Sequence, residues 1–126
     1  MKPSSVKRRI RRFSKLEPNW NSYGAVPVTP DAIDDAITLI ERSGNAIAWD
    51  GVSVDAAPGP DGGVLVEWDG GDRRLQVWRM GNGTYAGVAI QEHANAETDF
   101  IDRPYADMDA ALAELAATFP PGGSTP

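Results

Sequence analysis

Apolar and polar residues alternate in four short segments of the region 52–91, which is the most regular pattern in the chain. In the second segment, Val64, Val66 and Trp68 fall on one side of an extended strand and the intervening residues fall on the other. The same alternation recurs in the two segments that follow. Both faces of the predicted sheet carry large apolar groups, so the pattern predicts strands without assigning the face that packs.

Turn-forming residues separate these segments. Glycine, proline, aspartate and asparagine cluster at 58–63, 69–72 and 81–83, and such residues reach the positive φ angles that tight hairpins require. A parallel crossover needs a dozen or more residues, so the short loops favour antiparallel pairing. The sequence therefore predicts a four-stranded antiparallel meander over about 52–91.

Helical spacing of apolar residues predicts three helices, at about 5–16, 30–43 and 107–118. The residues at this spacing are Val6, Ile10, Phe13 and Leu16 in the first, Ile33, Ala36, Ile37 and Ile40 in the second, and Met108, Leu112, Leu115 and Phe119 in the third. Thr29 is a good N-cap and Pro30 suits the first position of the second helix. Together with the meander, these helices predict an α+β fold in the order α-α-β-β-β-β-α.

The length of 126 residues is that of one domain, and a chain of this size buries roughly two thirds of its unfolded surface. We divide it into a basic amphipathic helical arm at 1–16, a single α+β domain at 17–120 and a disordered tail at 121–126.

The sequence contains no cysteine, which excludes disulfides, thiolate catalysis and cysteine-based zinc sites. It also shows no apolar signal-peptide region near Met1 and no apolar run of membrane-spanning length. We therefore expect a cytoplasmic protein without a transmembrane segment, although a chain that lacks cysteine folds in any compartment.

Charge divides sharply along the chain. Seven of the twelve basic residues lie within the first fifteen positions, and all eighteen acidic residues follow from Glu17 onward. The remaining five basic residues leave the rest of the chain with a net charge of −13, although the whole chain carries only −6. The basic residues of the arm are Lys2, Lys7, Arg8, Arg9, Arg11, Arg12 and Lys15.

Two interpretations of the basic arm stay open. Lys7, Arg8, Arg9, Arg11, Arg12 and Lys15 are suited to bind nucleic-acid phosphates or an anionic membrane surface. Alternatively, the apolar stripe docks on the protein's own sheet while the basic side chains neutralise the acidic body, because apolar residues at helical spacing are typical of a core helix.

The loop at 19–27 is unusually aromatic. Trp20, Asn21, Ser22 and Tyr23 form a candidate partner surface, because loops on a rigid scaffold commonly carry binding residues. The alternative is an ordered crossing that closes one end of the core, with Asn and Ser side chains satisfying turn amides.

Two short motifs in the sequence resemble those of a known family. The segment from Trp20 to Ala25 reads Trp-Asn-Ser-Tyr-Gly-Ala, and the segment from Gly62 to Trp68 reads Gly-Gly-Val-Leu-Val-Glu-Trp. The chain resembles, over roughly 17–89, a family of small uncharacterised bacterial and phage-associated proteins with a Trp-(Asn/Asp)-x-Tyr-Gly-Ala loop and a Gly-Gly-(Ile/Val)-x-(Leu/Val)-Glu-Trp strand. That family has no established activity, so the resemblance implies an α+β fold and no catalytic residues.

No catalytic or metal-binding constellation stands out. His93 is the only histidine, and a histidine among carboxylates is suited to act as a general base or a metal ligand. One histidine with scattered acids in a polar loop is a weak signal, because a catalytic pair needs a nucleophile or a water site and a metal site needs three or four ligands. Glu67 on a central strand is the other carboxylate to consider for a functional role, and the alternative is a solvent-facing residue paired with Arg74 or Arg79. We therefore expect a protein that is not an enzyme and uses no cofactor and no metal.

The three helices are expected to cover one face of the sheet, with Asp34, Asp35 and Glu41 of the second facing water. The other face would then leave aromatic residues partly exposed as a partner surface. The residues expected to be exposed there are Leu65, Trp78, Trp68 and Tyr85. The predicted partner-binding residues are Trp68, Trp78 and Tyr85 of this face together with Trp20, Asn21 and Tyr23.

These observations favour a non-enzymatic protein-binding module, such as a small inhibitor, antitoxin, immunity or phage-encoded anti-defence protein, because an acidic body suits a basic partner surface. A nucleic-acid-associated accessory protein that binds phosphates through the arm is the second hypothesis. The third is a homo-oligomer in which the arm of one copy lies on the acidic surface of another.

Overall fold

The computed structural model describes residues 2–47, 49–92 and 98–120 of the chain. They form three α-helices, one 3-10 helix and one five-stranded sheet. In chain order the elements are α1 (Pro3–Arg12), η1 (Phe13–Lys15), α2 (Pro30–Ser43), β1 (Ser53–Pro58), β2 (Val64–Asp69), β3 (Arg73–Arg79), β4 (Tyr85–Glu92), β5 (Thr98–Tyr105) and α3 (Met108–Thr118). The predicted α+β class is confirmed.

The sheet is a meander in the spatial order β1-β2-β3-β4-β5, with every neighbouring pair antiparallel. The prediction of four strands was one too few, because β5 follows the polar segment that we assigned to a loop. Its sequence does not alternate and includes Pro104, yet eight register pairs with β4 provide a full ladder. Proline is tolerated there because β5 is an edge strand.

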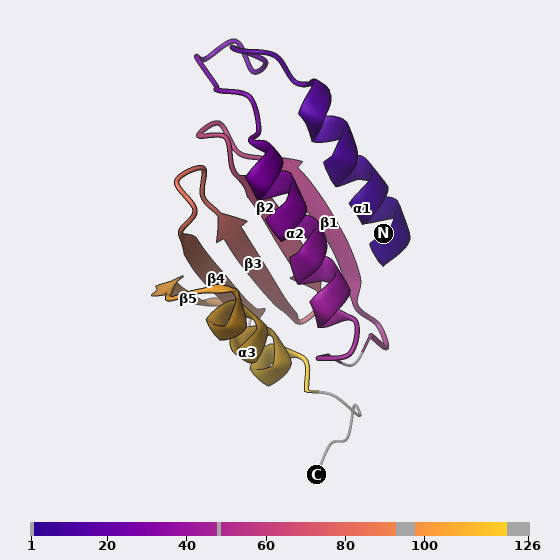
Figure 1. Ribbon diagram of the computed structural model, residues 1–126. Coiled ribbons are helices and arrows are strands. Elements are labelled where there is room, and N and C mark those ends of the chain that lie inside the picture. Colours follow the sequence, from indigo (N-terminus) through magenta and orange to yellow (C-terminus); the bar gives the residue numbers. More distant parts are fainter. Residues whose placement is uncertain (1, 48, 93–97, 121–126) are drawn as a thin grey trace.

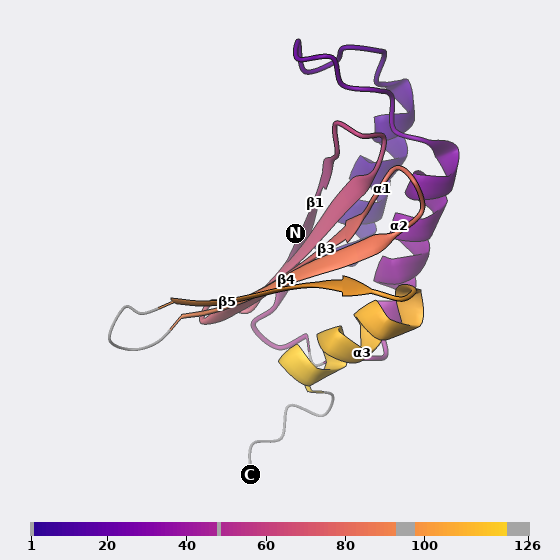
Figure 2. The ribbon, with the colours of Figure 1, turned by 90° about the vertical axis from the view of Figure 1, so that its left-hand side faces the viewer.

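All three helices lie on the same face of the sheet (Figures 1 and 2). Helix α1 contacts β1, α2 contacts β2 and β3, and α3 contacts β3, β4 and β5, so the helices follow the order of the strands they cover. Figure 2 shows the sheet nearly edge-on, with the helices on one side only. The opposite side is the open face.

Local signals in the sequence explain where the helices begin. Thr29 Oγ1 accepts a hydrogen bond from the Ala32 amide at 3.1 Å and Pro30 occupies the first turn of α2. Asp107 Oδ1 accepts in the same way from the Ala110 amide at 3.0 Å at the start of α3. In each helix, one of the amide groups that have no partner within the helix is thereby satisfied.

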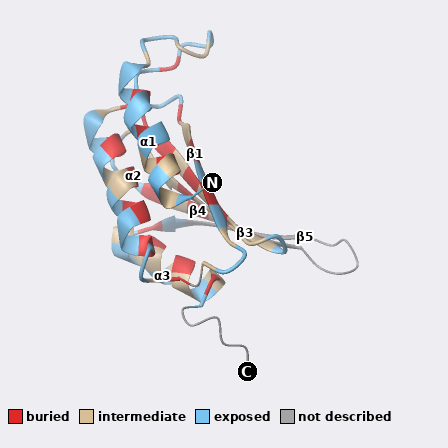
Figure 3. Cartoon of the chain, turned by 90° about the vertical axis from the view of Figure 1, so that its right-hand side faces the viewer, coloured by how far each residue is buried: buried red, intermediate tan, exposed pale blue. Residues whose placement is uncertain are grey.

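The core lies between the helices and the sheet, where the buried residues concentrate (Figure 3). Strand residues contribute to it in alternation, so that Val66 and Trp68 of β2 and Val77 of β3 point toward the helices. Trp68 is fully buried. Burying an aromatic side chain of this size contributes several kcal/mol at about 25 cal/mol per Å².

Helix α1 belongs to this same core. Val6 and Ile10 are fully buried, and Phe13 of η1 retains only 7% exposure. Of the two interpretations of the basic segment, the structure supports the one in which its apolar stripe docks on the protein's own body. Residues 2–16 therefore share one core with the rest of the described domain, and the predicted tail at 121–126 lies outside the described residues.

Candidate functional site: the open face of the sheet

The strand register places an apolar row across the open face. Each residue of the row pairs with the next one on the neighbouring strand, and the row reads Ala57, Leu65, Trp78, Ala86 and Pro104. The first four are half-buried, and Pro104 is exposed. No described helix covers this row, so its central pair, Leu65 and Trp78, is accessible to a partner.

A polar row runs beside the apolar one. Asp55 of β1 pairs with Glu67 of β2, and Glu67 pairs with Gln76 of β3. The Gln76 side-chain amide donates a hydrogen bond of 2.7 Å to Glu67 Oε2, which fixes the position of this carboxylate. The structural alternative for Glu67 named Arg74 or Arg79 as its cross-strand partner, whereas the register gives Gln76.

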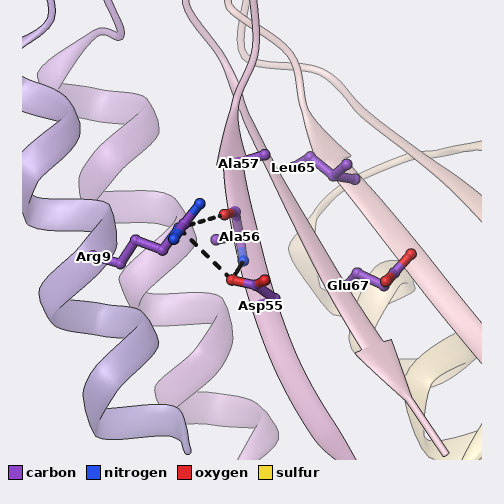
Figure 4. Close-up of a pocket in the computed structure, with 6 residues that line it drawn as sticks. All are labelled: Arg9, Asp55, Ala56, Ala57, Leu65 and Glu67. Atoms are coloured by element: carbon purple, nitrogen blue, oxygen red, sulfur yellow. Dashed lines mark hydrogen bonds and ion pairs between the residues drawn. The ribbon is translucent and has the colours of Figure 1, made fainter. Parts of the chain in front are cut away.

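The two rows meet in a shallow cavity of about 160 Å³ near β1. Its lining consists of Arg9, Asp55, Ala56, Ala57, Leu65 and Glu67 (Figure 4). Pockets for small organic ligands generally measure about 300–1,000 Å³, so this cavity is too small for such a ligand. It is large enough to receive a single side chain of a partner protein.

Arg9 of α1 borders this cavity and also protects the edge of the sheet. Its Nε donates a hydrogen bond of 3.0 Å to the Ala56 carbonyl and lies 3.7 Å from Asp55 Oδ1 (Figure 4). Asp55 Oδ1 in turn accepts a hydrogen bond of 2.8 Å from the Ala56 amide. Pro58, at the end of β1, carries no amide donor. The outward-facing backbone groups of Ala56 are therefore already paired, which discourages the addition of another strand.

Trp68 and Tyr85 do not belong to the open face. Trp68 is fully buried and Tyr85 retains 8% exposure, and both lie on the side covered by the helices. Our assignment of these two residues to a partner surface is therefore corrected. Their alternation with Leu65 and Trp78 was visible in the sequence, but choosing the covered face required the positions of the helices.

The aromatic loop between α1 and α2 closes on itself. Asn21 Oδ1 accepts hydrogen bonds from the amides of Tyr23 at 2.8 Å and Ala25 at 3.2 Å. Asn19 Oδ1 accepts one from the Gly24 amide at 2.7 Å, and the Trp20 indole N–H donates to the Val26 carbonyl at 3.0 Å. The Asn side chains thus satisfy turn amides, as the ordered-crossing alternative expected, and the Trp20 side chain adds a further contact within the loop.

Tyr23 is the exception within this loop, because 91% of its surface is exposed. The loop is tied to the β1–β2 turn, where the Val26 amide donates to the Pro60 carbonyl at 3.0 Å. It extends beyond the end of the sheet (Figures 1 and 2). Tyr23 is therefore held in solvent by a loop with many internal hydrogen bonds, and it remains a candidate contact residue.

The basic residues of α1 and η1 divide into two groups. Lys7 and Arg9 contact carboxylates of the protein itself, with Lys7 Nζ 3.5 Å from Glu41 Oε2 and Arg9 beside Asp55. The others are exposed, and within the described chain none of them forms an ion pair. These are Arg8, Arg11, Arg12 and Lys15.

The described residues also bear on whether the protein holds a metal ion. Within the described residues, no group of three or more His, Asp or Glu side chains is placed to hold a metal ion. His93 lies outside the described residues. Burial raises the pKa of Tyr85 above its usual value of 10.0, and the charge of Asp35 raises it further, but this phenol lies in the core rather than on the open face.

None of the described helices has the length and apolar character needed to cross a membrane. Comparison with known proteins gives no match, since no family model fits the sequence and no curated protein or solved structure is significantly similar to it. The assignment of this site therefore depends on its own geometry.

Proposed function

We propose that this chain is a protein-binding module that uses the open face of its sheet to occupy the surface of a partner protein. The observation that carries the proposal is the uncovered apolar row, in which Leu65 and Trp78 are cross-strand neighbours at its centre. Trp is among the residues that contribute most to interface affinity, and an exposed apolar patch bordered by polar residues is typical of a binding surface.

The polar row determines what kind of partner fits. Asp55 and Glu67 lie directly beside the apolar row, and Asp69 lies on the same face two register pairs beyond Glu67. A partner that presents apolar side chains flanked by Lys or Arg would match both rows. The net charge of the whole chain, −6, attracts such a surface over a longer range.

A second copy of the chain is a poorer occupant of this face. A second copy presents the same carboxylates, Asp55 and Glu67, beside its own apolar row, so at this position two open faces offer each other like rather than opposite charge. We therefore favour a different protein as the partner. Inhibitors, antitoxins, immunity proteins and phage-encoded anti-defence proteins act in this way, by covering a partner's surface without chemistry.

The test begins with affinity capture from the native host by the tagged full-length protein, at low and high salt, in parallel with Trp78→Ala and Thr38→Ala variants. Thr38 is exposed on α2, on the opposite side of the molecule, and provides the matched control. A protein retained by the wild type and by Thr38→Ala is then purified, and its affinity is measured by calorimetry.

We expect Trp78→Ala to weaken binding of the purified partner by about 30-fold or more, the effect of a central interface residue. Thr38→Ala should leave the affinity unchanged. If every protein that the wild type retains is bound equally well by Trp78→Ala and by a Leu65→Ala/Trp78→Ala double variant, the open face is not the binding surface and the proposal fails.

A further inference from the structure

A second surface, on the outer side of α1 and η1, has a chemistry different from that of the open face. Arg8, Arg11, Arg12 and Lys15 are all exposed there. None of them makes an ion pair with any residue in the described part of the chain, although the protein contains eighteen acidic residues. We call these four residues the basic stripe.

The carboxylates that α1 does contact are already neutralised. Lys7 pairs with Glu41 at 3.5 Å, and Arg9 lies 3.7 Å from Asp55. These two pairs use the basic residues of α1 that face α2 and β1. The charge of the basic stripe is consequently free for an external anion.

The burial of the apolar residues of α1 and η1 indicates which kind of anion, a membrane surface or a nucleic acid, suits the basic stripe. Val6, Ile10 and Phe13 pack in the core, so α1 has no apolar side left to insert between lipids. Amphipathic helices that bind membranes need such a side. The basic stripe also contains no aromatic residue on which an unpaired base could stack, and stacking is the usual means of binding single strands.

From these contacts we propose that the basic stripe binds the phosphate backbone of double-stranded DNA without reading its sequence. Three of its four members are arginines, whose planar guanidinium groups match phosphate oxygens in a bidentate manner. Arg8 and Arg12 lie one helical turn apart, about 6 Å along the axis. The stripe therefore presents a short line of cations to a line of phosphates.

The acidic residues of α3 add little repulsion at the basic stripe at physiological salt. Helix α2 lies between α1 and α3, which carries Asp109 and Glu114 (Figure 1). Packed helices lie about 8–10 Å apart, so α3 is about 16–20 Å from α1. That is about two Debye lengths, over which exposed charges are largely screened.

Fluorescence anisotropy with a short labelled DNA duplex of random sequence tests this proposal on the full-length protein. Four phosphate contacts predict that the logarithm of the binding constant falls against the logarithm of the salt concentration with a slope of about −3.6. Arg12→Gln should reduce the magnitude of the slope by about 0.9, and Arg8→Gln/Arg12→Gln by about 1.8. Arg42→Gln, which removes the same charge from α2, is the control and should leave the slope unchanged.

The proposal is overturned if the duplex fails to bind at low salt, if Arg42→Gln and Arg12→Gln have the same effect, or if poly-glutamate or phosphatidylserine vesicles compete as well as the duplex itself. Circular dichroism of each variant shows whether α1 is still folded. Trp78→Ala should bind the duplex like the wild type, so this result is independent of the one that tests the open face.

Discussion

Arg79 of β3 and Asp35 of α2 form an ion pair that joins the sheet to the middle helix. Nε and Nη2 of Arg79 lie 2.9 and 2.8 Å from the same oxygen, Asp35 Oδ2, and Nη1 donates to the Met80 carbonyl at 2.8 Å. The Arg79 side chain retains 8% exposure, whereas that of Asp35 retains 40%. The pair therefore lies at the border of the core.

Asp35→Asn should destabilise the fold, because it leaves the buried guanidinium without its counter-charge. Removing one partner of a fully buried pair costs about 3–5 kcal/mol, and the partial exposure of Asp35 reduces our expectation to about 2 kcal/mol. Urea unfolding followed by circular dichroism measures the loss. Asp34→Asn alters an exposed residue next to it and should change the free energy of unfolding by less than about 0.5 kcal/mol. Equal effects of the two substitutions would contradict a role for the pair.

Tyr85 should make stability depend on pH in the alkaline range. Burial, and then the charge of Asp35, raise its folded-state pKa above the usual value of 10.0, so the folded protein holds the phenol proton more tightly than the unfolded chain. This contribution is complete below about pH 10 and is lost as the pH rises through the folded-state pKa. Unfolding free energies measured from about pH 9 to 11 should fall less steeply for Tyr85→Phe than for the wild type. Tyr23→Phe, at an exposed position, should follow the wild type.

Trp68 and Trp78 lie on neighbouring strands but on opposite sides of the sheet, and truncation should separate their roles. Trp68→Ala removes a fully buried side chain and should cost about 3–5 kcal/mol. Trp78→Ala removes a half-buried side chain from the open face and should cost at least about 2 kcal/mol less. Chemical denaturation of both variants under one condition provides the comparison. A larger loss for Trp78 would mean that the open face is part of the core.

Ser22 adopts a φ angle of 65° in the loop that carries Tyr23. In this left-handed region of φ, a non-glycine residue destabilises the folded state by about 1–2 kcal/mol, and glycine does not. Glycine instead increases the conformational entropy of the unfolded chain, which lowers stability by about 0.5–1 kcal/mol. Ser22→Gly should therefore raise the free energy of unfolding by about 0.5 kcal/mol. Ser5→Gly, within α1, should lower it by a similar amount because glycine disfavours helices. Thermal melting of the pair checks the opposite signs.

Much of the architecture could be predicted from local sequence signals. The helix predicted at 30–43 was confirmed at both ends, because its capping residue and first-turn proline act locally. The first helix was predicted from position 5 but begins at Pro3, where proline occupies the first helical position with no side-chain cap. The prediction also continued the α-helix to 16, whereas Phe13–Lys15 form a 3-10 turn.

What could not be predicted depends on contacts between elements far apart in sequence. Asp35 was expected to face water together with Asp34 and Glu41. The sequence of α2 gives no sign that Asp35 pairs with Arg79, which lies 44 residues later in the chain. The sequence also could not show which face of the sheet is open. Leu65 and Val66 point to opposite faces and have similar hydrophobicity, so only the positions of the helices identify the covered one. The apolar row could be identified only from the strand register, which places Ala57, Ala86 and Pro104 in line with Leu65 and Trp78.

The contact between Arg9 and Ala56 bears on how this chain would behave after proteolytic clipping. Loss of the N-terminal residues through position 15 would leave the Ala56 carbonyl without its hydrogen bond. It would also expose the apolar surface that Val6 and Ile10 cover. An unprotected edge next to exposed apolar surface invites strand addition between copies, and we expect the clipped protein to grow into larger assemblies visible by light scattering. Helix α1 would then be the segment that prevents the sheets of different copies from associating. Cleavage after α1, followed by its loss, would convert the protein into a form that aggregates.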